Sequence, residues 1–152
     1  CLTLSLTPLE RLTQFGQWIL YRRMLGLFVF FYASVHLLIY LGLDYQFAWT
    51  DIQDDILKHK YVLVGFLAWL LLIPLAFTST NTMIKKLKKR WKSLHQLIYL
   101  VAVLAILHFF WLVKKDLTEP IIYGSILATL LLIRVYYFAK NKLSKNKKNN
   151  EN

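Results

Sequence analysis

Histidines are the residues of this sequence best able to do chemistry, and there are four of them. His36, His95 and His108 lie within long apolar stretches or at their ends, whereas His59 lies between two such stretches. An imidazole in hydrocarbon costs free energy unless it faces the interior of a helix bundle and has a partner there. Three kinds of partner are open: a metal, a proton path, or a purely structural hydrogen bond between helices.

Depth along the helices favours a metal for two of these side chains. His36 is 12 residues from the start of its apolar stretch and His108 is 14 residues from the start of its own, which correspond to about 18 Å and about 21 Å of helix. Both stretches run in the same direction, so the two imidazoles fall at nearly the same height. Such a pair can clamp one iron from both faces of a porphyrin and leave no open position. We therefore predict His36 and His108 as axial ligands of an electron-carrying haem.

His95 precedes His108 by 13 residues, which places it about 20 Å away along the helix, near the inner surface. That height suits a second haem below the first. On an ideal helix, however, the two imidazoles would point about 140° apart, so a shared face requires a distorted helix. The alternative for His95 is a hydrogen bond near Ser93.

Arginines near the inner surface are candidates for binding anions. Arg22 and Arg23 lie at the depth of His95, and Arg90 lies in the following basic connection. Their guanidinium groups could pair with haem propionates or with the phosphate of a flavin nucleotide. The alternative is that they set the membrane topology and contact lipid phosphate.

The sequence lacks the motifs of several other functions. It contains no Walker loop, GxGxxG, CxxC or paired intramembrane carboxylate. These absences argue against soluble dinucleotide binding, thiol redox chemistry and proton-coupled transport. Cys1 is the single cysteine, so there is no internal disulfide. Residues 1–7 are typical of the end of a truncated transmembrane helix, and we expect at least one further membrane segment upstream.

Long apolar helices must position these side chains. The chain of 152 residues is 57% apolar and only 18% charged, more apolar surface than a domain of this size can bury. Four stretches approach the roughly 20 residues that cross a bilayer; they are 24–43, 61–77, 94–113 and 121–139. The sequence therefore predicts an all-α, polytopic transmembrane helix bundle with four complete spans. The net charge of +11 does not indicate nucleic-acid binding, because the cations are confined to the connections.

Basic residues fall in alternate connections, which predicts the orientation of the spans. The segment before the first span, the third connection and residues 140–152 are rich in Lys and Arg, and we expect them in the cytoplasm. The connections at 44–60 and 114–120 are expected to face the other compartment, the former with an interfacial turn that places Trp49 at headgroup depth. We therefore expect a bacterial inner-membrane protein whose C-terminus is a disordered, basic, cytoplasmic tail over 140–152.

Several stretches of the sequence carry a resemblance to a known family. They are YRRMLGLFVFFYASVHLLIY at 21–40 and, within 73–113, LAFTST, KRWKSLHQLIYL and ILHFFWLV. In these residues the chain resembles the haem-binding membrane subunits of periplasmic methionine sulfoxide reductase systems, within the ferric reductase-like transmembrane family. The resemblance covers nearly the whole chain, from LTPLERL near the start to the last span.

The resemblance implies a six-span cytochrome that binds one or two haem b groups, of which the first span and most of the second are absent here. Residues 8–139 would form the ferric reductase-like haem domain. His36, His95 and His108 coincide with three haem-associated histidines of the family. Electrons would come from a cytoplasmic flavin reductase or from the quinone pool, with FMN as a further cofactor. They would leave to a periplasmic molybdopterin catalytic subunit, MsrP, that reduces methionine sulfoxide in oxidised proteins.

Two other functions stay open from the sequence. One is a stand-alone ferric or cupric reductase, against which the short tail after Ala139 argues. The other is a haem-free membrane scaffold or transporter, in which the histidines only form hydrogen bonds to neighbouring helices.

Overall fold

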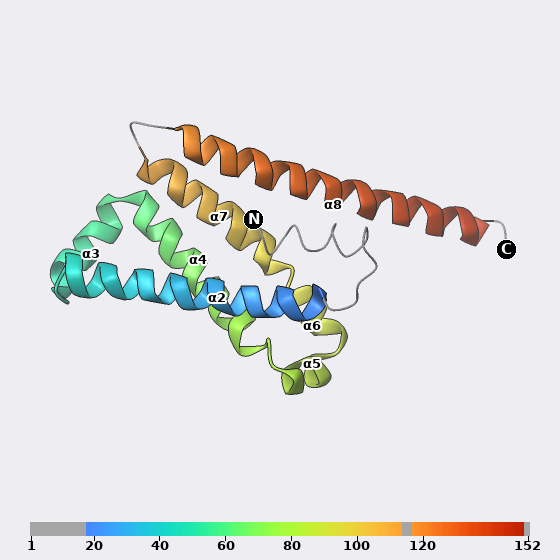
Figure 1. Ribbon diagram of the computed structural model, residues 1–152, viewed down its shortest axis with the longest axis horizontal. Helices are drawn as coiled ribbons and strands as arrows, with labels where there is room; N and C mark the ends of the chain where they lie inside the picture. The colour runs from blue at the N-terminus through green and yellow to red at the C-terminus, as the bar shows by residue number, and fades with distance from the viewer. Residues whose placement is uncertain (1–17, 114–116, 151–152) are drawn as a thin grey trace.

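The computed structural model describes residues 18–113 and 117–150, and the regular structure in these ranges is helical (Figure 1). In chain order the elements are α2 (Trp18–Ile39), the π-helix η1 (Tyr40–Asp44), α3 (Trp49–Lys58), α4 (Lys60–Phe77), α5 (Asn81–Leu87), α6 (Lys89–Leu94), α7 (Leu97–Leu112) and α8 (Thr118–Asn150). Among the described residues, four helical segments are long and apolar enough to cross a membrane; they are Tyr21–Asp44, Lys60–Phe77, Lys89–Leu112 and Thr118–Tyr137. The predicted all-α fold with four spans is confirmed.

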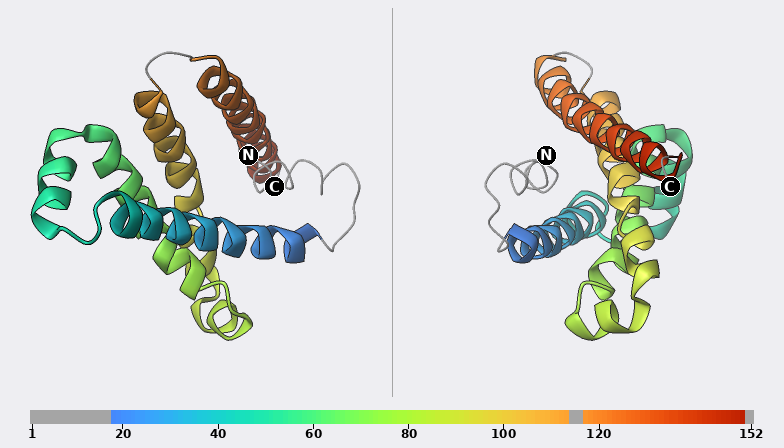
Figure 2. Two further views of the ribbon diagram at one scale, coloured as in Figure 1. Left: turned by 60° about the vertical axis from the view of Figure 1, so that its left-hand side comes forward. Right: turned by 90° about the vertical axis from the view of Figure 1, so that its right-hand side faces the viewer.

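The central helix of the bundle is α4. It packs extensively against α7 and more lightly against α2, while α8 packs against α7. Successive spans alternate in direction, so that α2 and α7 run one way and α4 and α8 run the other (Figure 1). Figure 2 shows α3 at one end of α4 and α5 at the other. Because α2 and α7 run in the same general direction and cross near α4, their side chains His36 and His108 can come to one level.

Few side chains in the described residues are buried, as expected when lipid covers the surface of a span. They are Ile52, Ala68, Leu72, Leu75, Val101, Pro120 and Leu127. In contrast, Phe31, Tyr32 and Leu38 on α2 are 58%, 67% and 61% exposed. Packing between helices is therefore concentrated where α4 meets its neighbours.

Side chains from two other helices bind the C-terminal end of α4, where carbonyls lack partners within the helix. The Arg23 guanidinium on α2 donates through Nε to the Ser79 carbonyl at 3.1 Å and through Nη1 to Asn81 Oδ1 at 2.7 Å. Trp91 Nε1 on α6 donates to the Thr78 carbonyl at 2.9 Å. These bonds fix the ends of α2, α4 and α6 relative to one another.

The connection expected to hold a short interfacial turn contains a helix of 10 residues, α3. Its Asp55 carboxylate accepts hydrogen bonds from Tyr40 Oη at 2.8 Å and from His59 Nδ1 at 2.7 Å. Tyr40 belongs to η1 and His59 directly precedes α4. The Asp55 side chain is only 13% exposed. Asp55 therefore ties the end of α2 to the start of α4.

The expected disordered tail over 140–152 is wrong for the part that the structure describes. There α8 continues as a helix of 33 residues to Asn150. The sequence after Gly124 contains neither Pro nor Gly, and its many lysines are good helix formers, so nothing local ends the helix. At 1.5 Å per residue, α8 is about 50 Å long, which exceeds the roughly 30 Å hydrocarbon thickness.

Replacing Asp55 with Asn should destabilise the bundle, because the amide cannot replace a charged acceptor for both donors. The expected loss is about 1–3 kcal/mol, which is typical of hydrogen bonds to an ionised group. Thermal unfolding of the protein in nanodiscs measures it. Asp54→Asn is the matched control, because Asp54 and its partner Lys58 are 69% and 68% exposed and surface ion pairs contribute little. Equal losses for the two variants would contradict this role.

Acid should remove the same stabilisation. Burial alone would raise the pKa of the Asp55 carboxyl, but its interactions with Tyr40, Tyr45 and His59 outweigh burial and lower the pKa below its usual value. A lowered folded-state pKa stabilises the fold above about pH 4 and loses that effect as the pH falls through the folded-state value. The difference in Tm between wild type and Asp55→Asn should therefore be full near about pH 6 and shrink towards about pH 3. A difference that grew in acid would contradict the assignment.

Candidate metal centre

The structure brings the rings of His36 and His108 together from two different spans. Their ring centroids lie 6.4 Å apart, with the ring planes at 80°. Two metal–nitrogen bonds of about 2 Å, plus about 1 Å from each nitrogen to its ring centre, place axial imidazole centroids about 6 Å apart. The observed separation therefore fits one iron between the rings. Their role as ligands stays a prediction.

A backbone carbonyl of α4 orients His108. His108 Nδ1 lies 2.7 Å from the carbonyl oxygen of Tyr61. Because a carbonyl only accepts hydrogen bonds, Nδ1 carries the hydrogen and Nε2 keeps its lone pair. Metal-ligating histidines are usually held in this way by their second nitrogen. His108 is therefore prepared to donate its Nε2 lone pair to a metal.

Gly65 makes room for the His108 ring against α4. A Cβ atom at this position would lie 2.6 Å from His108 Nδ1 and 2.8 Å from Cε1, closer than van der Waals contact allows. Tyr61 and Gly65 are four residues apart, so they share one face of α4. Sequence reasoning missed both residues. The available signal was the single glycine in the apolar stretch 61–77.

The position of His36 depends on how α2 rests against α4. Trp69 Nε1 on α4 donates to Ser34 Oγ on α2 at 3.0 Å, two residues from His36. Ser34 Oγ in turn donates to the Phe30 carbonyl at 2.8 Å. His36 itself is exposed, and its ring contacts His108. A ligand between these two rings would therefore be accessible from the side of α2.

The helix containing His95 is interrupted at that residue. α6 ends at Leu94 and α7 begins at Leu97, and the His95 carbonyl accepts from Ile98 N at a long 3.5 Å. The distortion that a shared face with His108 would require is therefore present. The angle of about 140° expected between His95 and His108 on an ideal helix therefore does not apply to this interrupted one.

A nitrogen of His95 is buried and lacks a polar partner. The ring packs on Trp91 with a centroid separation of 4.1 Å. Its Nε2 has no hydrogen-bond partner within the described part of the chain, and neither does Tyr99 Oη one turn later. The predicted hydrogen bond near Ser93 therefore does not involve Nε2. A buried, unpaired nitrogen costs free energy that a metal would offset.

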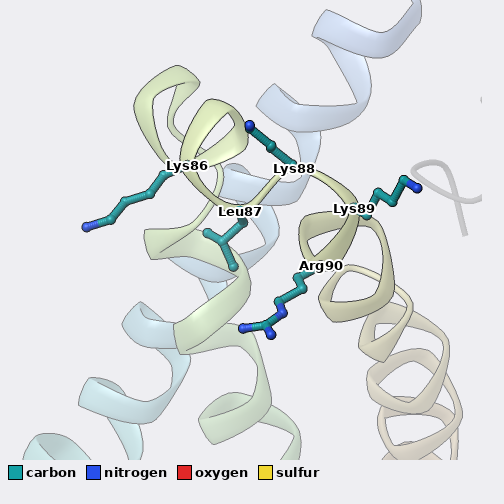
Figure 3. A pocket seen from close by; sticks show the side chains of 5 residues that line it. All are labelled: Lys86, Leu87, Lys88, Lys89 and Arg90. Carbon is teal, nitrogen blue, oxygen red and sulfur yellow. The ribbon is translucent and has the colours of Figure 1, made fainter.

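The three arginines do not converge on one point. The Arg23 guanidinium binds Ser79 and Asn81, while Arg22 lies close enough for its charge to act on His95. Arg90 lines an open pocket of about 450 Å³ with Lys86, Leu87, Lys88 and Lys89. Figure 3 shows the lysine side chains of this pocket extending in different directions. Contacts of these arginines with propionate or flavin phosphate stay predictions.

No group of three or more His, Cys, Asp or Glu side chains converges on a metal position within residues 18–113 and 117–150. A bare ion would need more protein ligands than the pair at positions 36 and 108 supplies. A porphyrin supplies four nitrogens of its own and leaves at most two positions for protein ligands, so haem suits the observed pair.

The chain is similar to known membrane proteins over most of its length. The family described as ferric reductase like transmembrane component matches residues 1–106. A protein of Xanthomonas campestris pv. campestris (strain B100) is 55% identical over 135 residues, 89% of this chain and 62% of the relative. A protein of Herminiimonas arsenicoxydans is 50% identical over 149 residues, 96% of this chain and 68% of the relative. Both are named protein-methionine-sulfoxide reductase heme-binding subunit MsrQ.

The chain spans about 62% of the length of the Xanthomonas relatives that it matches. No solved structure matches it.

Gly65→Ala should weaken haem binding, because the added methyl group displaces the His108 ring and breaks its bond to the Tyr61 carbonyl. We expect about a 10- to 100-fold lower haem affinity, as for loss of a group that orients a ligand. Optical titration of the intact natural protein with haem measures this affinity. Gly26→Ala is the control, because a Cβ at Gly26 meets nothing within 4 Å. Unchanged affinity in Gly65→Ala would show that the His108 orientation does not matter.

Proposed function

Since the chain belongs to the ferric reductase-like transmembrane family, we propose that it is the haem-binding, electron-carrying subunit of a methionine sulfoxide reductase system. The names of its relatives support this assignment. The observation that carries the proposal is the 6.4 Å separation of the His36 and His108 rings, which fits two axial ligands of one haem b.

Each residue of the site has a specific task in this proposal. His36 and His108 would hold the haem iron, while the Tyr61 carbonyl orients His108 and Gly65 gives the ring its space. The bound haem supplies one-electron chemistry. With a histidine from each of two spans as its ligands, the iron would have no position left for oxygen or substrate, and the site would transfer electrons only.

His95 is the proposed ligand of a second haem nearer to the opposite end of the bundle. Its support is the buried Nε2 without a partner and the interruption between α6 and α7 at this residue. Two haems at different depths would carry an electron through the bilayer in two shorter steps.

The proposed orientation places the basic α5–α6 region and the C-terminus in the cytoplasm of a bacterial inner membrane, with α3 on the periplasmic side. The distribution of charge supports it, because the α5–α6 region carries six Lys and Arg between residues 85 and 92, while α3 carries three aspartates. Electrons would enter from a cytoplasmic flavin reductase, with FMN as a carrier, or from the quinone pool. They would leave to the periplasmic molybdopterin subunit MsrP.

Substitution of the ligands tests the proposal. In the intact natural protein, His36→Ala or His108→Ala should abolish the reduced low-spin spectrum of one haem b, because a five-coordinate iron does not give that spectrum. His95→Ala should spare this haem and remove only a second one, if the haem content per chain is two. Gln53→Ala, on the exposed face of α3, is the control. A colourless wild-type protein would instead favour a haem-free scaffold.

A further inference from the structure

Residues 85–92 carry a concentration of positive charge that the surrounding chain does not balance. Six of these eight residues are Lys or Arg, and all six are exposed. The sequence contains no Asp or Glu from 56 to 115. Within residues 18–113 and 117–150, the ion pairs are those of Asp54 and Asp55 in α3. The countercharge for residues 85–92 therefore comes from outside this part of the chain.

These cations lie where two spans reach the membrane surface. The span Lys60–Phe77 ends shortly before α5, and the span Lys89–Leu112 begins with α6. Figure 2 shows α5 at the opposite end of α4 from α3. Residues 85–92 are therefore at the depth of the lipid headgroups, whose phosphates attract Lys and Arg.

Hydrogen bonds hold both short helices of this segment in place. Asn81 Oδ1 at the start of α5 accepts a bond from Arg23 on α2 at 2.7 Å. Trp91 Nε1 in α6 donates to the Thr78 carbonyl at the end of α4 at 2.9 Å. Between the two helices, Lys88 adopts φ 48° and ψ −117°, a conformation that turns the chain sharply and is more usual for glycine. The helices α5 and α6 therefore form a corner of defined shape.

The open pocket of about 450 Å³ lies at this corner. Its lining combines four cations with one apolar side chain, and the residues are Lys86, Leu87, Lys88, Lys89 and Arg90. Leu87 is half-buried. In Figure 3 the lysine side chains extend in different directions around it, so a single small anion cannot contact all of them. A headgroup with two separate phosphates can contact more of them, and the apolar wall beside the charges suits an amphipathic ligand.

We propose that the pocket between α5 and α6 binds a membrane phospholipid with two phosphate groups, as in cardiolipin. The Arg90 guanidinium suits bidentate binding of one phosphate, and the lysine ammonium groups neutralise the other. Leu87 contacts the glycerol backbone and the first carbons of the acyl chains. The inference goes beyond electron transfer and requires no haem, since the residues of the pocket are separate from His36 and His108.

Such a lipid would also stabilise the helix that precedes His95. Lys89 and Arg90 lie directly before Trp91, whose ring packs on the His95 ring with the centroids 4.1 Å apart. A phosphate that binds these cations restricts α6 and favours the observed position of both rings. Because the lipid site exists only in the folded protein, cardiolipin should raise the Tm.

Native mass spectrometry of the intact natural protein in detergent measures lipid binding directly. Titration with tetraoleoyl cardiolipin should show one tightly bound lipid per chain, with an affinity at least about tenfold above that for dioleoyl phosphatidylglycerol, which has one phosphate. Equal affinity for the two lipids, or for the zwitterionic dioleoyl phosphatidylcholine, would overturn the proposal. Displacement of cardiolipin by inorganic pyrophosphate or FMN at equal concentration would also overturn it, because the ligand would then be a soluble phosphate compound.

A double substitution shows whether this pocket is the site. Lys86→Gln with Arg90→Gln should weaken cardiolipin binding about 30-fold, because each Lys or Arg near a membrane surface contributes about a fivefold factor. It should also reduce the rise in Tm that cardiolipin gives the wild type. Lys58→Gln with Lys60→Gln is the matched control, since it removes the same charge at the α3 end. Equal losses in the two variants would show a general attraction between charges and no specific site.

Loss of basic residues can also change the orientation of the spans, so a further variant keeps the charge. Arg90→Lys cannot bind a phosphate through two N–H groups of one planar fork. It should weaken cardiolipin binding about fivefold, and an affinity equal to that of the wild type would count against the site.

Discussion

The hydrogen bond from His108 Nδ1 to the Tyr61 carbonyl is the contact on which the site depends. It holds the ring against α4, sets which nitrogen faces the metal position, and forms only because Gly65 leaves the space. A carbonyl has two lone pairs, so Tyr61 can accept this bond and one from its own helix. The close packing of α4 and α7 therefore has a chemical result. The contact between these two apolar helices holds the His108 ring in one orientation.

The Asp55 network has a comparable role at the end of the bundle. One carboxylate accepts from Tyr40 at the end of α2 and from His59 at the start of α4, so the connection between these spans is fixed at both sides. The bond from His59 also determines which of its two ring nitrogens carries the hydrogen. One carboxylate therefore fixes both the packing of two spans and the tautomer of an imidazole.

The sequence predicted those features of the fold that depend on local properties of the chain. Apolar run length predicted the four spans, and the rise per residue placed His36 and His108 at one level. The sequence did not predict the partners of His108. The Tyr61 carbonyl and Gly65 lie 47 and 43 residues before it in the chain, and their contact with its ring depends on how α4 and α7 pack. The helix α3 was not predicted because it has only 10 residues and its sequence is half polar, so its apolar residues form too short a helical pattern. The tail was misjudged because composition indicated solvation, whereas lysine-rich segments also extend an existing helix.

The interruption at His95 has a mechanical consequence. A continuous helix transmits rotation along its axis, because each hydrogen bond fixes the phase of the next turn. Between α6 and α7 this coupling is weak, with the Ile98 amide 3.5 Å from the His95 carbonyl. The position of the His108 ring is therefore set by α4, through the Tyr61 carbonyl and the space beside Gly65, and not by the hydrogen bonds that continue α6 into α7.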